Sequence, residues 1–105
     1  MKRGEVRWYK FTHPDKARPV VILTRDSAIG YLAEVTVAMI TTTIRDIPCE
    51  VLLGKGDGMP RECVVNIDTM TTIAKARLQE RQAVLSPGKM KDVSAAIRFA
   101  LGMDD

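Results

Sequence analysis

Apolar residues along the first four-fifths of the chain fall into short runs that predict β-strands. The run at residues 6–12 mixes aromatic and β-branched side chains, which suit a half-buried strand. The runs at 19–24 and 35–41 are almost continuously apolar, as in strands buried on both faces. Pro48 indicates that another strand begins there or lies at an edge. The six expected strands cover residues 6–12, 19–24, 35–41, 47–53, 62–68 and 82–85.

The end of the chain predicts a long helix. Ser86 is a suitable N-cap, and Pro87 stands at the first helical position, where its missing N–H does no harm. Apolar residues then recur every three or four positions, and Gly102 follows as a C-terminal capping residue. This apolar stripe consists of Met90, Val93, Ile97 and Leu101. Several short strands followed by one helix predict a mainly β fold, a barrel-like and mostly antiparallel sheet with the helix packed on it.

The segments between these elements are short and rich in turn-forming residues. Residues 13–17 and 54–60 predict turns, and residues 75–78 predict a single helical turn. With 105 residues and no repeat or low-complexity stretch, the chain is expected to form one domain over residues 1–105. Apolar residues make up 46% and charged residues 28%, a balance typical of globular proteins and not of disordered ones.

The remaining composition points to the cytoplasm. No apolar segment follows Lys2 and Arg3 as it would in a secretory leader, and no window reaches the roughly 18 apolar residues of a membrane helix. Cys49 and Cys63 form no CxxC pair, and the chain has a single histidine, so a zinc site is not expected. Both cysteines are expected to be buried thiols. The net charge of +3 is compatible with nucleic acid.

Common catalytic motifs do not occur in the chain. It contains no HExxH, no calcium-binding DxDxDG loop and no GxxxxGK[ST] phosphate loop, and the glycine-rich stretch at 54–58 fits a turn better than a phosphate site. Neither a cofactor nor a metal is therefore expected.

Five segments resemble the motifs of the MazF/PemK (Kid-like) family of toxin–antitoxin mRNA interferases. The family's counterparts are, in chain order, RGEIW, RPVLV, VxPIT, LPxDSVV and RTIDKxRL. The matching segments here are KRGEV (residues 2–6), KARPVVIL (16–23), VAMIT (37–41), PRECVV (60–65) and TIAKARL (72–78). Their shared order and spacing extend the resemblance over nearly the whole chain.

The resemblance implies an SH3-like or plasmid-toxin barrel, a homodimer, and cleavage of single-stranded RNA without a metal. The implied reaction is attack of a 2′-hydroxyl on the adjacent phosphate, and the implied catalytic pair is Arg18 and Thr41. The chemistry is reasonable, because a guanidinium matches the geometry of a phosphate and fixed donors stabilise the charge that accumulates there. Outside the family, an arginine beside a proline is most often a solvated surface residue, and a threonine ending a strand is most often a β-former.

Further candidates for catalysis or RNA binding surround this pair. His13 lies in the loop before Arg18, and Asp68 matches an aspartate of Kid-like members, which have an arginine in place of Asn66. The aromatic side chains at positions 8, 9 and 11 could stack on bases, although two of the three are expected to pack in the core or in a dimer interface, because neighbours alternate between faces. The additional candidate residues are His13, Lys16, Thr42, Asn66 and Asp68.

Three departures from the family pattern bear on RNA affinity, cleavage motif and rate. Met39 replaces the proline of VxPIT, Thr71 replaces an arginine that commonly helps to bind RNA, and Asn66 replaces another arginine. The implied partners are single-stranded RNA and an antitoxin with an acidic, partly disordered tail. Two alternatives remain open at this point: a toxin of the same fold that poisons DNA gyrase, and an SH3-like RNA-binding module that does not cut.

Overall fold

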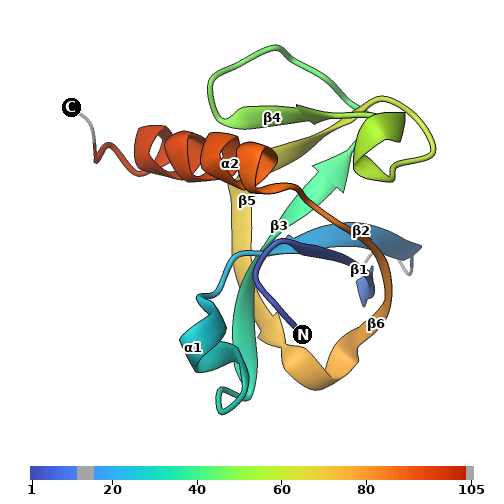
Figure 1. The fold of residues 1–105 in the computed structure, drawn as a ribbon, viewed down its shortest axis with the longest axis vertical. Coiled ribbons are helices and arrows are strands. Elements are labelled where there is room, and N and C mark those ends of the chain that lie inside the picture. The colour runs from blue at the N-terminus through green and yellow to red at the C-terminus, as the bar shows by residue number, and fades with distance from the viewer. Residues whose placement is uncertain (12–15, 104–105) are drawn as a thin grey trace.

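The computed structural model describes residues 1–11 and 16–103. Within these ranges, six strands form one bent sheet in the order β4-β5-β3-β2-β1-β6, and neighbouring strands pair antiparallel. Figure 1 shows the long helix α2 crossing one end of this sheet, with the short helix α1 away from it. The elements are β1 (Glu5–Phe11), β2 (Lys16–Ile22), α1 (Asp26–Ile29), β3 (Glu34–Thr41), β4 (Glu50–Leu53), η1 (Lys55–Asp57), β5 (Cys63–Ala74), η2 (Lys75–Arg77), β6 (Leu78–Val84) and α2 (Pro87–Ala100). The predicted fold class, mainly β with a C-terminal helix, is confirmed.

The expected strands all occur, but several have different ends. β2 begins at Lys16, so the last two residues of the turn expected at 13–17 are already strand. β5 continues to Ala74, well beyond the expected end at 68, and β6 begins at Leu78 in place of 82. β4 is an edge strand that begins two residues after Pro48, in agreement with the edge position that this proline indicates. The helical turn expected at 75–78 is the 3₁₀ turn η2.

Both faces of the central strands are buried, as their continuous apolar runs predict. Val21 packs into one core cluster, whereas its neighbours Val20 and Ile22 pack into a second cluster on the opposite face. Helix α2 covers the first cluster through Val93, and α1 covers the second through Ile29. The alternation of side chains along β2 therefore divides the core into two layers, one on each face of the bent sheet.

Helix α2 begins as predicted and ends with less burial than predicted. The hydroxyl of Ser86 accepts a hydrogen bond from the backbone N–H of Lys89 (3.1 Å), which confirms the N-cap. Gly102 adopts a φ of 69°, the left-handed conformation expected of a residue that follows a helix. The expected apolar stripe fails at Leu101, which is 60% exposed because the helix extends past the core it covers. Within the described part of the chain, neither helix is long and apolar enough to cross a membrane.

Candidate functional site

A pocket of about 410 Å³ lies where the pairing of β2 and β3 stops. The last pair of this ladder joins Val20 to Met39. Arg18, two residues before Val20, and Thr41, two residues after Met39, both line the pocket just beyond this last pair. The pocket is lined by Trp8, Lys16, Ala17, Arg18, Pro19, Ile40, Thr41, Thr42, Met59, Pro60, Arg61, Cys63 and Gln82.

Neighbouring residues in the sequence determine the backbone conformation of Arg18 and the hydrogen bonding of Thr41. Pro19 restricts Arg18 to extended backbone, which fits its position near the start of β2. Arg18 is partly exposed, and among the described residues none forms a hydrogen bond or ion pair with its guanidinium. The hydroxyl of Thr41 accepts a hydrogen bond from the backbone N–H of Thr43 (3.2 Å), so its own proton remains available as a donor. The pocket thus receives a cation and a hydroxyl donor from adjacent strands.

The aromatic side chains of β1 separate as the alternation predicts. Tyr9 is buried in the second core cluster, where its ring meets that of Phe11 edge to face at a centroid distance of 4.7 Å. Arg77 lies over the Tyr9 ring at 5.3 Å. Trp8 is instead partly exposed and lines the pocket. Two of the three aromatic residues therefore pack internally, and Trp8 alone of the three reaches the pocket.

The additional candidate residues divide into three groups. Lys16 and Thr42 line the pocket beside the central pair. Asn66 and Asp68 are not among its lining residues, because they lie in β5 where that strand bends. His13 lies outside the described residues. The pocket also contains residues that the sequence did not single out, namely Met59, Pro60, Arg61 and Gln82.

Asn66 and Asp68 belong to an irregularity in β5. The register between β3 and β5 shifts just before the pair of Met39 and Asn66. There the backbone N–H of Met39 donates to the hydroxyl of Thr69 (3.0 Å), and that hydroxyl donates to the backbone oxygen of Asn66 (2.6 Å). The side-chain oxygen of Asn66 accepts from the backbone N–H of Asp68 (3.0 Å). These bonds replace missing ladder bonds and bend β5, so Asn66 has a structural role here.

The carboxylate of Asp68 is paired with a thiol. Cys49 Sγ donates to Asp68 Oδ2 at 2.9 Å, and this hydrogen bond, followed by burial, raises the pKa of Cys49 above its usual value. Burial likewise raises the pKa of Cys63. Both cysteines are free and buried, which confirms the expectation from the sequence.

The raised thiol pKa values predict a loss of stability at alkaline pH. Below the ordinary thiol pKa of 9.0, each thiol is protonated in both the folded and the unfolded chain. Above it, the unfolded chain releases the protons first, so the free energy of unfolding falls as the pH rises toward the raised values. Urea unfolding of wild type and Cys49→Ala from about pH 7 to about pH 10 measures this. The stability difference between the two proteins should shift against wild type as pH rises, and a constant difference would contradict the assignment.

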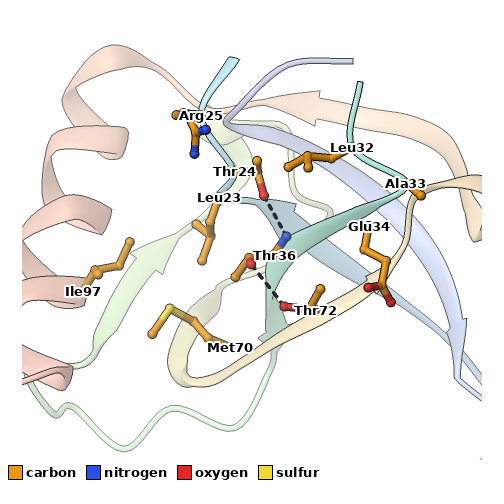
Figure 2. A pocket seen from close by; sticks show the side chains of 10 residues that line it. All are labelled: Leu23, Thr24, Arg25, Leu32, Ala33, Glu34, Thr36, Met70, Thr72 and Ile97. Carbon is orange, nitrogen blue, oxygen red and sulfur yellow. Dashed lines mark hydrogen bonds between the residues drawn. The ribbon is translucent and has the colours of Figure 1, made fainter. Parts of the chain in front are cut away.

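Figure 2 shows a second pocket, of about 640 Å³, between the end of β2, the start of β3, β5 and α2. It is larger than the pocket that contains Arg18 and Thr41, but its hydroxyl groups form hydrogen bonds with one another and with the backbone. Thr24 Oγ1 accepts from the backbone N–H of Thr36 (2.7 Å), and the hydroxyls of Thr36 and Thr72 lie 3.3 Å apart. The smaller pocket is the better candidate, because it contains Arg18 and Thr41, the pair that the family resemblance implies, whereas neither lines the larger one.

A metal centre has no obvious place in this part of the molecule. Across residues 1–11 and 16–103, no group of three or more His, Cys, Asp or Glu side chains is arranged to hold a metal ion.

Comparison with known proteins identifies the family. Residues 2–101 match the model of the PemK-like, MazF-like toxin of type II toxin–antitoxin systems. The chain belongs to this toxin family. It is 39% identical over 100 residues to a probable endoribonuclease MazF5 of Mycobacterium tuberculosis, with 94% of this chain and 91% of that protein covered. It is 37% identical over 89 residues to an endoribonuclease MazF of Staphylococcus saprophyticus, with 82% and 74% covered.

Solved toxin structures share the fold over nearly their whole length. The Mycobacterium tuberculosis toxin MazF-mt6 superposes with a TM-score of 0.86 at 34% identity, covering 93% of this chain and 96% of that one. A mycobacterial endoribonuclease solved in complex with its cognate antitoxin has a TM-score of 0.88 at 28% identity, covering 98% and 96%. The resemblance inferred from the five sequence segments is therefore confirmed at the level of both sequence family and fold.

Proposed function

We propose that this toxin is an endoribonuclease that cuts single-stranded RNA, with Arg18 and Thr41 as its catalytic residues. The observation that carries the proposal is that both residues line one pocket, just beyond the point where β2 and β3 stop pairing. Relatives named as endoribonucleases, at up to 39% identity over 94% of the chain, support the activity over gyrase poisoning or RNA binding without cleavage.

The proposed reaction is a transesterification within the RNA. The 2′-oxygen forms a bond to phosphorus while the bond from phosphorus to the 5′-oxygen breaks; the 2′-hydroxyl releases its proton and the leaving 5′-oxygen takes one up. Negative charge grows on the non-bridging oxygens, which the Arg18 guanidinium is suited to bind in a fork. A guanidinium stays protonated at neutral pH and is therefore a poor proton carrier, so Arg18 is assigned charge stabilisation.

Thr41 is assigned the second donor. Because its oxygen accepts from the Thr43 N–H, its hydroxyl proton points away from that bond and can be given to a phosphate oxygen. Two donors fixed on adjacent strands need no reorganisation as the charge develops, which is the source of their effect on the rate.

Cleavage in the presence of a chelator tests the function. Purified protein is incubated with a mixed-sequence single-stranded RNA in EDTA, and the products are separated by gel electrophoresis. The proposal expects discrete products ending in a cyclic phosphate. Intact RNA after long incubation would overturn it, as would activity that EDTA abolishes.

Replacing Thr41 by valine tests the second donor with little change of shape. The variant is expected to lose roughly 10- to 150-fold in the rate of RNA cleavage, since a hydrogen bond to a charged group is worth about 1.5–3 kcal/mol. Single-turnover cleavage with excess enzyme measures the rate of the chemical step. Thr41→Ser, which keeps the hydroxyl, should retain most of the rate, and equal rates for the valine variant and wild type would exclude Thr41 from catalysis.

The proposed setting is a cytoplasmic homodimer inhibited by an antitoxin. Phe99, Leu101 and Met103 are 54%, 60% and 64% exposed at the end of α2, which supports a surface covered by another chain. The net charge of +3 favours both RNA and an antitoxin with an acidic tail that folds on binding. We also propose that residues 1–105 form a single domain, as the length of the chain indicates.

A further inference from the structure

Gln82 occupies an irregular position in the edge strand β6. In the pairing of β1 with β6, Val6 faces Ala83, whereas the next residue, Arg7, faces Arg81. One residue of β6 is therefore extra between these two pairs, and that residue is Gln82. A β-bulge of this kind leaves the extra residue out of the ladder and changes the direction of its side chain.

The bulge brings Gln82 to the same pocket as Arg18 and Thr41. Gln82 is partly buried, and its Oε1 is covered without a hydrogen-bond partner among the described residues. A covered carbonyl oxygen without a partner costs free energy in the folded protein. A ligand reaches this oxygen only when the amide turns it toward the pocket, and pairing with a hydrogen-bond donor of the ligand then removes that cost.

The surroundings of the amide fit a nucleobase. Trp8, Pro19, Met59 and Pro60 supply flat or apolar surface to the pocket, which suits the faces of a base. An amide carries one acceptor and one donor group, and base edges present donors and acceptors side by side. The volume of about 410 Å³ lies in the range of pockets that hold a small ligand.

We propose that Gln82 is a specificity-determining residue, which reads the edge of the base that enters the pocket next to the scissile phosphate. This inference rests on the proposed nuclease function. It assigns Gln82 no part in the chemical step: the amide selects one base at one position of the cleavage motif, while Arg18 and Thr41 act on the phosphate. Bidentate pairing of this kind discriminates between bases by roughly 5- to 150-fold.

The test compares cleavage motifs on a random-sequence RNA pool digested in EDTA, with the cut ends sequenced. Gln82→Leu removes donor and acceptor at similar size, and it should reduce the preference at a single position by roughly 5- to 150-fold while the other positions keep theirs. Gln82→Glu presents acceptors only and should shift that position toward guanine, whose N1–H and N2–H are adjacent donors. Gln79→Leu is the matched control, because Gln79 lies exposed on the same strand and does not line the pocket.

The outcomes separate this inference from the nuclease function. An unchanged motif for a folded Gln82→Leu protein overturns the inference, and so does an equal loss at every position. If Gln82→Leu does not fold by circular dichroism, the nearly isosteric Gln82→Glu decides alone. If wild type leaves the pool uncut, the nuclease function fails, and the RNA retained on immobilised wild type and on the Gln82 variants is sequenced in its place. If the RNA retained on wild type shows a base preference at one position, and only the Gln82 variants lose that preference, base reading by Gln82 is still supported. If no such preference is found, the inference is overturned.

Discussion

Replacing Arg18 by alanine is expected to lower the single-turnover rate of RNA cleavage by about 10²–10³-fold, the usual cost of losing a donor that stabilises developing charge. The physical reason is that Arg18 lines the same pocket as Thr41, and no described residue forms a hydrogen bond or ion pair with its guanidinium. Because Arg18 is partly exposed and makes no described hydrogen bond, the alanine protein should unfold at nearly the wild-type urea concentration.

Arg18→Lys separates charge from geometry. Lysine keeps the positive charge but cannot bind two phosphate oxygens in a fixed fork, so its rate should fall by roughly tenfold or more and remain above that of alanine. Arg98→Ala is the matched control, since Arg98 is exposed on α2 and is not among the pocket residues. An Arg18→Ala protein that cuts at the wild-type rate would remove Arg18 from the mechanism.

Local patterns in the sequence account for the strands and the long helix. Val20, Val21 and Ile22 bury on both faces, as their continuous apolar run predicts, and Ser86 caps α2 through its hydroxyl. The short helix α1 was not predicted, because four residues are too few to show a helical period. Its placement depends on a distant contact, in which the backbone N–H of Arg3 donates to Asp26 Oδ1 at 2.7 Å.

The length of β5 could not be read from its residues. Thr69, Thr71 and Thr72 interrupt the apolar pattern after residue 68, yet the strand continues because its partner β3 offers a ladder on the far side of the bend. Thr69 completes that bend through two hydrogen bonds of its hydroxyl. Pairing between strands far apart in sequence is a tertiary effect that local propensity does not contain.

The residues of the pocket were predicted only in part, because the pocket also depends on pairing between strands far apart in sequence. Arg18 and Thr41 came from the resemblance to a family, since nothing in their own neighbourhood shows that they meet. The structure brings both to one pocket, where each lies two residues beyond the last β2–β3 pair of Val20 and Met39. Gln82 was missed because a bulge has no signature in the sequence of one strand; it becomes visible only when β6 is paired with β1. Asn66 is a candidate for RNA binding by analogy, and its side-chain oxygen accepts from the backbone N–H of Asp68 at the bend of β5.

Replacing Gly58 by alanine is expected to destabilise the protein by roughly 2–5 kcal/mol and to reduce RNA cleavage at the same time. Gly58 has a φ of 90°, and an added β-carbon would lie 2.9 Å from the β-carbon of Ala83. The left-handed conformation costs about 1–2 kcal/mol for a side chain, and overpacking adds about 1–3 kcal/mol. The loop must then move, and with it Met59 and Pro60, which line the pocket next to Gly58. Urea unfolding and single-turnover cleavage measure the two effects.

A second substitution distinguishes the contact from the backbone strain. Ala83→Gly removes the atom that the new side chain would meet, so the double variant Gly58→Ala/Ala83→Gly should recover the overpacking part and keep the cost of positive φ. Gly56→Ala is the matched control: its β-carbon would meet no atom within 4 Å, and a change of at most about 0.5 kcal/mol is expected. If the two losses of stability add and the double variant shows no recovery, the contact between residue 58 and Ala83 does not position the loop against β6. Recovery of stability together with cleavage would instead establish that this single close approach positions the loop for RNA.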